Sequence, residues 1–194
     1  MIEAELRYYI QPLFNFVGET TYFKFFTPNK ITALAFISGV FSGCAIAGNY
    51  LYLALMLLLF SGLCDVMDGT IARLTNNTQK VGAYIDLISD RMVEAAVILG
   101  FTILMPENYF AFILFFVAVL FHFTTFLATS VLYDNQSEKS IYYDHSLVER
   151  AEAFLVFSLM LLFPIYSFSL LMIFNTIVFF DGLARFYRII SLSK

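Results

Sequence analysis

Long apolar stretches alternate with short polar connectors along most of the chain. Each stretch is close to the roughly 20 residues that a helix needs to cross the hydrocarbon core of a bilayer. They cover residues 31–48, 50–72, 81–104, 109–133, 148–165 and 168–190. The pattern predicts an all-α integral membrane protein with six transmembrane helices. Residues 29–194 would form one bundle, the membrane part of a single domain covering residues 1–194.

The first 28 residues follow a different pattern. Residues 2–17 place apolar side chains along one helical stripe and charged or amide side chains on the opposite face. Such a segment is too polar to span the bilayer, and we expect an amphipathic juxtamembrane helix lying on the membrane surface. A turn would then lead into the bundle within residues 1–28. An ordinary helix packed beneath the bundle is the alternative.

The basic residues indicate how the bundle is oriented. With six spans the connectors alternate between the two sides, and all 11 Lys and Arg residues fall at or near one side. By the positive-inside rule that side is cytoplasmic. We therefore expect a multi-pass protein of the cell inner or plasma membrane, with both termini in the cytoplasm.

Composition agrees with this class. The chain is 60% hydrophobic and 13% charged, whereas soluble domains are about 45–50% apolar and about 25% charged. A net charge of −4 argues against binding to nucleic acid. Cys44 and Cys64 lie in apolar runs and are expected to be buried free thiols rather than a disulfide framework.

Four aspartates lie inside the predicted membrane region, at positions 65, 68, 86 and 90. Carboxylates are costly there and usually serve a function. Asp65 and Asp68 are three residues apart, and Asp86 and Asp90 four apart, so each pair would share one face of a helix. An antiparallel hairpin would gather all four around one point, where divalent cations are the simplest way to neutralise them. The cluster flanks the connector 73–80 and should therefore face the cytoplasm.

The neighbours of these aspartates favour a phosphate ligand. Gly69 costs about 1 kcal/mol in a helix relative to Ala, which suggests close approach of a ligand to the backbone. Ala72 keeps the same surface low, and Arg73 supplies a planar cation suited to phosphate oxygens. Gly82 opens the next helix at an expected crossing point. This combination suits a pyrophosphate bridged by metal ions.

The string D-x2-D-G-x2-A-R-x8-G-x3-D-x3-D, complete between Asp65 and Asp90, resembles the signature of the CDP-alcohol phosphotransferase family. The resemblance extends over the six spans and the segment 27–32. It implies that a CDP-linked donor, usually CDP-diacylglycerol, transfers its phosphatidyl group to an alcohol and releases CMP. It also implies two divalent cations, Mg²⁺ or Mn²⁺, and a homodimer.

The resemblance further implies roles for individual residues. Asp65, Asp68, Asp86 and Asp90 would bind metal, and Asp90 would also be the catalytic base that accepts the proton of the acceptor hydroxyl. The implied donor contacts are Asn29, Thr32, Gly69, Ala72, Arg73 and Gln79, with Thr78 as an alternative to Gln79.

The acceptor is less well defined. Arg150 and Arg185 match positions that hold the phosphate of a phosphorylated acceptor, such as glycerol phosphate or inositol phosphate, in similar proteins. Such proteins tend to carry another basic residue at the position of Tyr133, and its absence argues against a phosphorylated acceptor unless Lys139 takes its place. Interfacial anchoring by snorkelling is the alternative role for both arginines. Arg91 is also expected at the interface, and Glu94 either reaches into the cavity or packs.

Two further features have open interpretations. Gly39 and Gly43 permit close helix contact, either within the bundle or between two copies. His122 lies in the middle of a predicted span and is expected to be a packing histidine rather than a metal ligand.

Two other functions are possible alternatives to a transferase. An ion-coupled transporter also uses intramembrane carboxylates, but a cation pathway does not require Gly69, Ala72 and Arg73. A non-catalytic CDP-lipid-binding protein would not need the complete set of aspartates. A purely structural salt-bridge network is disfavoured because Arg73 and Arg91 cannot neutralise four carboxylates.

Overall fold

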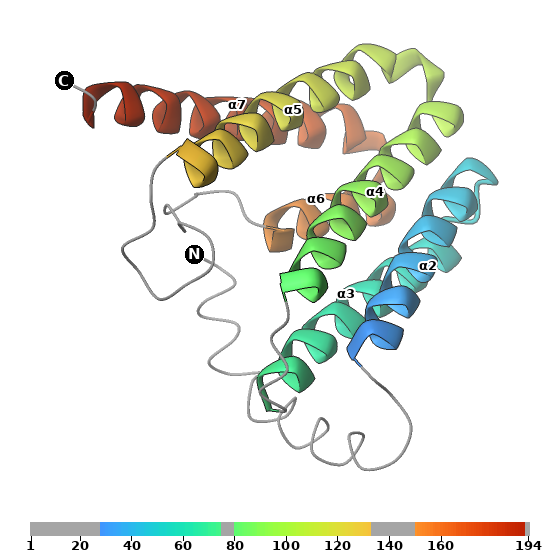
Figure 1. The fold of residues 1–194 in the computed structure, drawn as a ribbon. Coiled ribbons are helices and arrows are strands. Elements are labelled where there is room, and N and C mark those ends of the chain that lie inside the picture. Colours follow the sequence, from blue (N-terminus) through green and yellow to red (C-terminus); the bar gives the residue numbers. More distant parts are fainter. Residues whose placement is uncertain (1–27, 75–79, 133–149, 193–194) are drawn as a thin grey trace.

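The computed structural model describes residues 28–74, 80–132 and 150–192. These residues form helices, two of which are preceded by a short 3₁₀ turn, and contain no strand (Figure 1). The elements are α2 (Pro28–Ala47), α3 (Leu51–Leu74), α4 (Lys80–Leu104), η1 (Pro106–Asn108), α5 (Tyr109–Leu132), α6 (Arg150–Leu162), η2 (Pro164–Tyr166) and α7 (Ser167–Leu192). The predicted all-α class is confirmed. The predicted amphipathic helix at 2–17 lies outside the described residues.

The connectors at one end of the bundle are tight. Asn49 adopts a left-handed φ of 62°, and the Tyr50 N–H donates to the carbonyl of Ala45, which closes the C-terminus of α2. Pro106 and Pro164 each begin a 3₁₀ turn that leads directly into the next helix. All three connectors lack Lys and Arg, as the predicted orientation requires.

Four segments are long and apolar enough to cross a membrane: Lys30–Ala47, Leu51–Ala72, Pro106–Val131 and Pro164–Ser191. These segments make the chain an integral membrane protein. α4 has 25 residues but carries several charged side chains, and α6 has 13 residues. That both of these helices also cross the membrane, giving six spans, stays a prediction.

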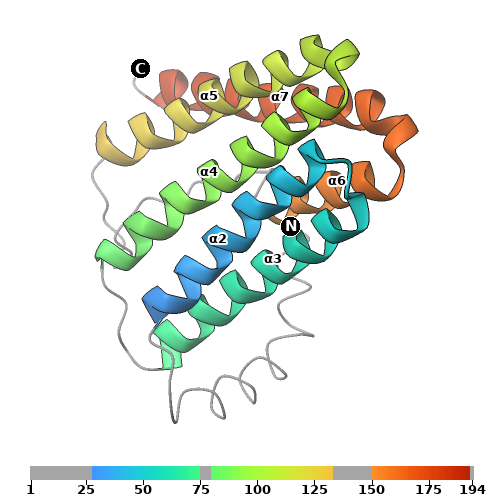
Figure 2. The same cartoon turned by 90° about the vertical axis from the view of Figure 1, so that its right-hand side faces the viewer.

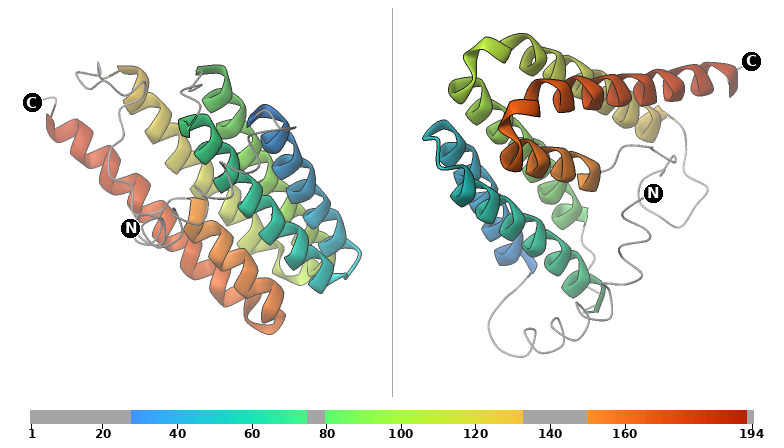
Figure 3. Two further views of the ribbon diagram at one scale, coloured as in Figure 1. Left: turned by 90° about the horizontal axis from the view of Figure 1, so that it is seen from below. Right: turned by 180° about the vertical axis from the view of Figure 1, so that it is seen from behind.

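The helices pack in two groups. α2 lies against both α3 and α4, whereas α5 pairs with α7, and α6 contacts α3 and α7 (Figures 2 and 3). Figure 1 shows the two groups close together at the tight connectors and diverging toward the other end of the bundle.

The distribution of core residues explains this divergence. The main core contains fully buried aromatic side chains such as Phe101, Phe112, Phe115 and Phe157, and it joins all six helices in the half nearer the tight connectors. Among the described residues, the end where α3 finishes and α4 begins has only a small cluster: Ile31, Ala35, Cys64 and Ile71. Close packing, the main attraction between helices in lipid, is therefore concentrated away from the aspartates.

Glycines set the contact between α2 and α4. A Cβ added at Gly43 would lie 2.3 Å from the carbonyl oxygen of Ala96, and one at Gly100 would lie 2.3 Å from the carbonyl oxygen of Gly43. A Cβ at Gly39 would meet Val93 at 2.5 Å. The small-residue motif at 39 and 43 therefore serves packing within the chain. The predicted crossing at Gly82 is wrong, because a Cβ there would meet nothing within 4 Å.

Candidate metal centre

Three of the four aspartates meet where α3 ends and α4 begins. Asp65 and Asp68 lie on the last turns of α3, and Asp86 lies on the second turn of α4. One carboxylate oxygen from each lies within 4.8 Å of the others. Asp68 is buried, while Asp65 and Asp86 are half-buried. The predicted convergence of two helix faces is thus seen for these three, which we call the aspartate triangle. Asp90, one turn further along α4, is not part of it.

A hydroxyl from the first turns of α2 orients the triangle. Thr32 Oγ1 donates a hydrogen bond of 2.5 Å to Asp68 Oδ2, and both side chains are buried. Because Oδ2 accepts this bond, the carboxylate is held at a defined angle. Hydrogen-bonded partners of this kind fix ligating carboxylates in metal sites. Thr32, expected as a donor contact, is therefore part of the aspartate site.

The donor atoms of the triangle suit a hard divalent cation. Carboxylate oxygens are the ligands that Mg²⁺, Ca²⁺ and Mn²⁺ prefer. Three carboxylates this close repel one another, and bringing charges out of water is expensive without a partner of opposite sign. A bound divalent cation offsets both costs, so the residues present fit the expected metal.

Only some of the predicted donor contacts lie within the described residues. Gly69 and Ala72 lie on α3 beside the triangle and are half-buried. Arg73 belongs to the last turn of α3 and Asn29 to the first turn of α2, but their side chains lie outside the described residues. Gln79 and Thr78 also lie outside them. Their roles stay predictions.

The second predicted acceptor residue, Arg185, is deeply buried in α7, with 2% of its surface exposed. Its Nη2 lies 3.9 Å from Asp181 Oδ2, and its Nη1 donates to the carbonyl oxygen of His122 at 3.4 Å. The guanidinium lies over the ring of Phe126, 5.6 Å from its centre. Snorkelling to the membrane surface, the alternative considered for this residue, is therefore wrong. The side chain of Arg150 lies outside the described residues.

Asp181 is a charged residue that the sequence argument overlooked. It is 7% exposed, and its Oδ2 accepts a hydrogen bond from Nε2 of His122 at 2.9 Å. His122 thus has a carboxylate partner, as a packing histidine should. The sequence does contain a signal for this residue, because Asp181 and Arg185 are four residues apart in one predicted span. An intramembrane carboxylate usually has a function or a partner.

Arg91 and Glu94 form a second charged contact, in which Arg91 is partly exposed. Arg91 Nη2 lies 2.7 Å from Glu94 Oε1, and Glu94 is 3% exposed. The Arg91 guanidinium lies over the ring of Phe123 on α5, 5.7 Å from its centre. Arg91 therefore joins α4 to α5, and its expected anchoring at the interface stays a prediction.

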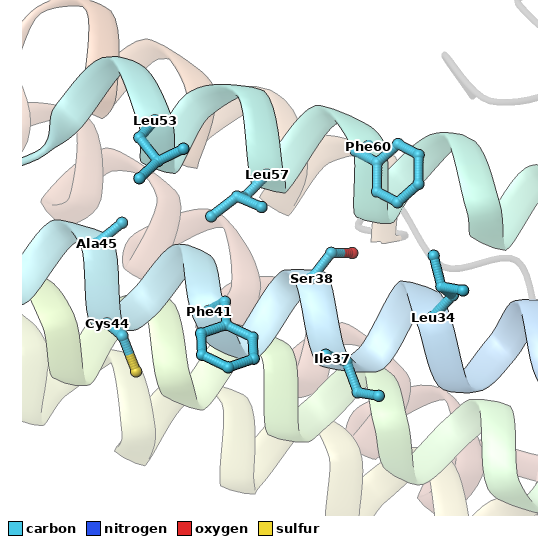
Figure 4. A pocket seen from close by; sticks show the side chains of 9 residues that line it. All are labelled: Leu34, Ile37, Ser38, Phe41, Cys44, Ala45, Leu53, Leu57 and Phe60. Atoms are coloured by element: carbon cyan, nitrogen blue, oxygen red, sulfur yellow. The ribbon is translucent and has the colours of Figure 1, made fainter.

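A separate apolar groove of about 540 Å³ runs along α2 and α3 (Figure 4). Of its nine lining residues only Ser38 is polar, and the Ser38 hydroxyl donates to the carbonyl of Ala35. The groove contains no member of the aspartate triangle and belongs to the apolar surface of the helices. Its lining residues are Leu34, Ile37, Ser38, Phe41, Cys44, Ala45, Leu53, Leu57 and Phe60.

The structure thus brings three carboxylates together at one end of a bundle of apolar helices. Residues 25–186 match the family model for CDP-alcohol phosphatidyltransferase, so the chain belongs to the CDP-alcohol phosphatidyltransferase family. This confirms the resemblance seen in the signature between Asp65 and Asp90. The family consists of transferases that act in phospholipid synthesis.

Three relatives illustrate the range of this family. The inner membrane protein YnjF of Escherichia coli is 31% identical over 172 residues, which is 84% of this chain and 83% of YnjF. The bifunctional IPC transferase and DIPP synthase of Aquifex aeolicus is 40% identical over 37% of this chain, but only 16% of its own length is covered. Archaetidylinositol phosphate synthase of Pyrococcus horikoshii is 28% identical over 43% of this chain and 45% of its own length.

Proposed function

We propose that the protein transfers a phosphatidyl group from CDP-diacylglycerol to the hydroxyl of an alcohol and releases CMP. The observation that carries this proposal is the aspartate triangle: carboxylates from α3 and α4 lie within 4.8 Å of one another inside the matched family domain. A site of this kind can hold divalent cations against the pyrophosphate of a CDP-linked lipid.

The protein side of the reaction follows from the residues around the triangle. Asp65, Asp68 and Asp86 would hold Mg²⁺ or Mn²⁺, with Thr32 orienting Asp68. The bound cations would polarise the donor pyrophosphate and offset the charge of the leaving CMP. Gly69 and Ala72 leave the surface of α3 low beside the carboxylates, so the donor can approach the helix closely.

Asp90 is the proposed general base. It lies one turn beyond Asp86 on the same face of α4 and outside the triangle. A base must reach the attacking hydroxyl rather than be fully occupied by metal. In the proposed step Asp90 takes the hydroxyl proton, the acceptor oxygen bonds to the phosphatidyl phosphorus, and the bond from that phosphorus to the oxygen of CMP breaks.

For the acceptor we propose a phosphorylated polyol, such as inositol phosphate or glycerol phosphate. Arg185 supports this choice, because a guanidinium suits phosphate oxygens. The name of one relative, an archaetidylinositol phosphate synthase, points to the same chemical class. Arg150 is the second proposed contact. The absence of a basic residue at Tyr133 makes the acceptor the first feature to test.

We further propose that six helices cross the membrane and that both termini and the triangle lie on the cytoplasmic side. The proposed working assembly is a homodimer. Positive-inside counting supports the orientation. An inner membrane relative supports the location.

The experiment is CMP release from CDP-diacylglycerol by the purified protein in mixed micelles. It is run with Mg²⁺ or Mn²⁺ and separately with inositol 1-phosphate, glycerol 3-phosphate, inositol or glycerol. We expect metal-dependent release with at least one phosphorylated acceptor. Folded protein that releases no CMP under any condition would exclude the enzyme and favour a CDP-lipid-binding role. A cation flux in vesicles without CMP release would favour the transporter.

A further inference from the structure

A group of charged side chains lies buried between α5 and α7, away from the aspartate triangle. Asp181 and Arg185 are 7% and 2% exposed, and His122 joins them from α5. Charges within a bilayer are costly and normally mark a function. We call His122, Asp181 and Arg185 the α5–α7 cluster.

The cluster holds the Arg185 guanidinium from several directions. Asp181 lies 3.9 Å from Nη2, the backbone carbonyl of His122 accepts from Nη1 at 3.4 Å, and Phe126 lies under the guanidinium plane. His122 in turn fixes Asp181 through a 2.9 Å hydrogen bond. An arginine side chain has several rotatable bonds, and these contacts restrict its orientation.

A line of polar residues connects α4 to this cluster. Asp86, Asp90 and Glu94 recur every four residues and therefore share one face of α4. Glu94 binds Arg91, whose guanidinium lies over Phe123, the residue next to His122 on α5. The face of α4 that carries the proposed base is thus linked to the part of α5 that holds Arg185.

We propose that His122 and Asp181 are positioning residues: they fix Arg185 as the ligand for the phosphate of the acceptor. The inference rests on the proposed function, in which Arg185 binds that phosphate. A neutral contact also joins the two helices, from Asn175 Nδ2 on α7 to the carbonyl of Ala111 at 2.9 Å, so charged and neutral contacts can be compared by experiment.

The test compares Asp181→Asn, Asp181→Glu and His122→Gln with the wild-type protein. Asn175→Ala serves as the control, because it also removes a buried polar contact between α5 and α7 but lies outside the cluster. The assay measures kcat and KM separately for CDP-diacylglycerol, for the phosphorylated acceptor and for the corresponding unphosphorylated polyol. Melting temperatures in detergent report folding.

Asp181→Asn should raise the KM for the phosphorylated acceptor by about tenfold or more, as expected when a buried charge loses its partner. Its kcat at saturating acceptor and its KM for CDP-diacylglycerol should not change, and Asp181→Glu should restore part of the loss. His122→Gln should act in the same direction. Asn175→Ala should lower the melting temperature and leave the KM for the acceptor unchanged.

Three outcomes would overturn the inference. If Asp181→Asn and Asn175→Ala lower the melting temperature alike and neither changes the KM for the acceptor, the cluster is structural and the proposed function stands. If the wild-type protein accepts only unphosphorylated alcohols, Arg185 has no phosphate to bind. If the wild-type protein releases no CMP with any acceptor, the proposed function itself fails, and the inference fails with it.

Discussion

Thr32 at the start of α2 donates a hydrogen bond to Asp68 near the end of α3, and both side chains are buried. This contact makes α2 part of the candidate metal centre, although α2 contributes no carboxylate to the triangle. Thr32 therefore orients Asp68, and this role can be tested separately from the expected contact of Thr32 with the nucleotide.

Thr32→Val should weaken metal binding because Asp68 loses the hydroxyl that orients it. Loss of an outer partner of a metal ligand typically costs about 10- to 100-fold in metal affinity or activity. Titration of the purified protein with Mn²⁺ measures the affinity directly. Thr32→Ser keeps the hydroxyl and should bind metal like the wild-type protein. Equal affinities for the Val and Ser variants would show that the hydrogen bond does not support the site.

Asp86→Asn and Asp90→Asn should both lower activity, but for different reasons. Asp86 belongs to the triangle, so its variant should lose both metal affinity and activity. Asp90 lies outside the triangle, so its variant should retain most metal affinity, while kcat falls by about 10²- to 10⁴-fold through loss of the general base. Metal titration and CMP release, measured on the same samples, separate the two effects. A similar loss of metal affinity in both variants would reassign Asp90 as mainly a metal ligand.

Gly43→Ala and Gly82→Ala should have opposite effects on stability. A Cβ at 43 would lie 2.3 Å from the backbone oxygen of Ala96, whereas a Cβ at 82 would meet nothing within 4 Å. Overpacking of this kind typically costs about 1–3 kcal/mol. Gly82→Ala should be neutral or stabilising, because Ala is the better helix former. Thermal unfolding in detergent measures both, and equal melting temperatures would contradict the packing described for α2 and α4.

The predicted orientation can be tested with single cysteines in a Cys44→Ser, Cys64→Ser background. Glu107→Cys, in the connector between α4 and α5, should react with a membrane-impermeant maleimide on intact spheroplasts. Lys30→Cys should react only after the membrane is opened, because positively charged ends stay in the cytoplasm. The reverse labelling pattern would place the aspartate triangle on the outer side.

The aspartate triangle could be predicted from the sequence because its members lie on two helices joined by a short connector. Spacings of three and four residues then suffice to place the side chains on one face. The α5–α7 cluster could not be predicted in the same way. His122 and Asp181 are 59 residues apart, and their contact depends on how α5 packs against α7, which a helical period does not reveal.

The glycines also show that contacts between helices cannot be predicted from sequence spacing alone. In the sequence, Gly39 and Gly43 are consistent with contact inside the bundle or between copies, and the positions of Val93 and Ala96 in the structure decide between them. Gly82 looked similar in sequence but faces open space. A small residue permits close approach, and the neighbouring helices determine whether an approach occurs.

The divergence of the two helix groups has a consequence for how such proteins can change. The triangle lies on α3 and α4, with Thr32 of α2 beside it, whereas Arg185 and its neighbours lie on α5 and α7 (Figure 1). Under the proposed function, donor chemistry and choice of alcohol therefore belong to different structural modules. Substitutions in the second module can alter the product without disturbing the first, so a single catalytic apparatus can give rise to different phospholipid headgroups.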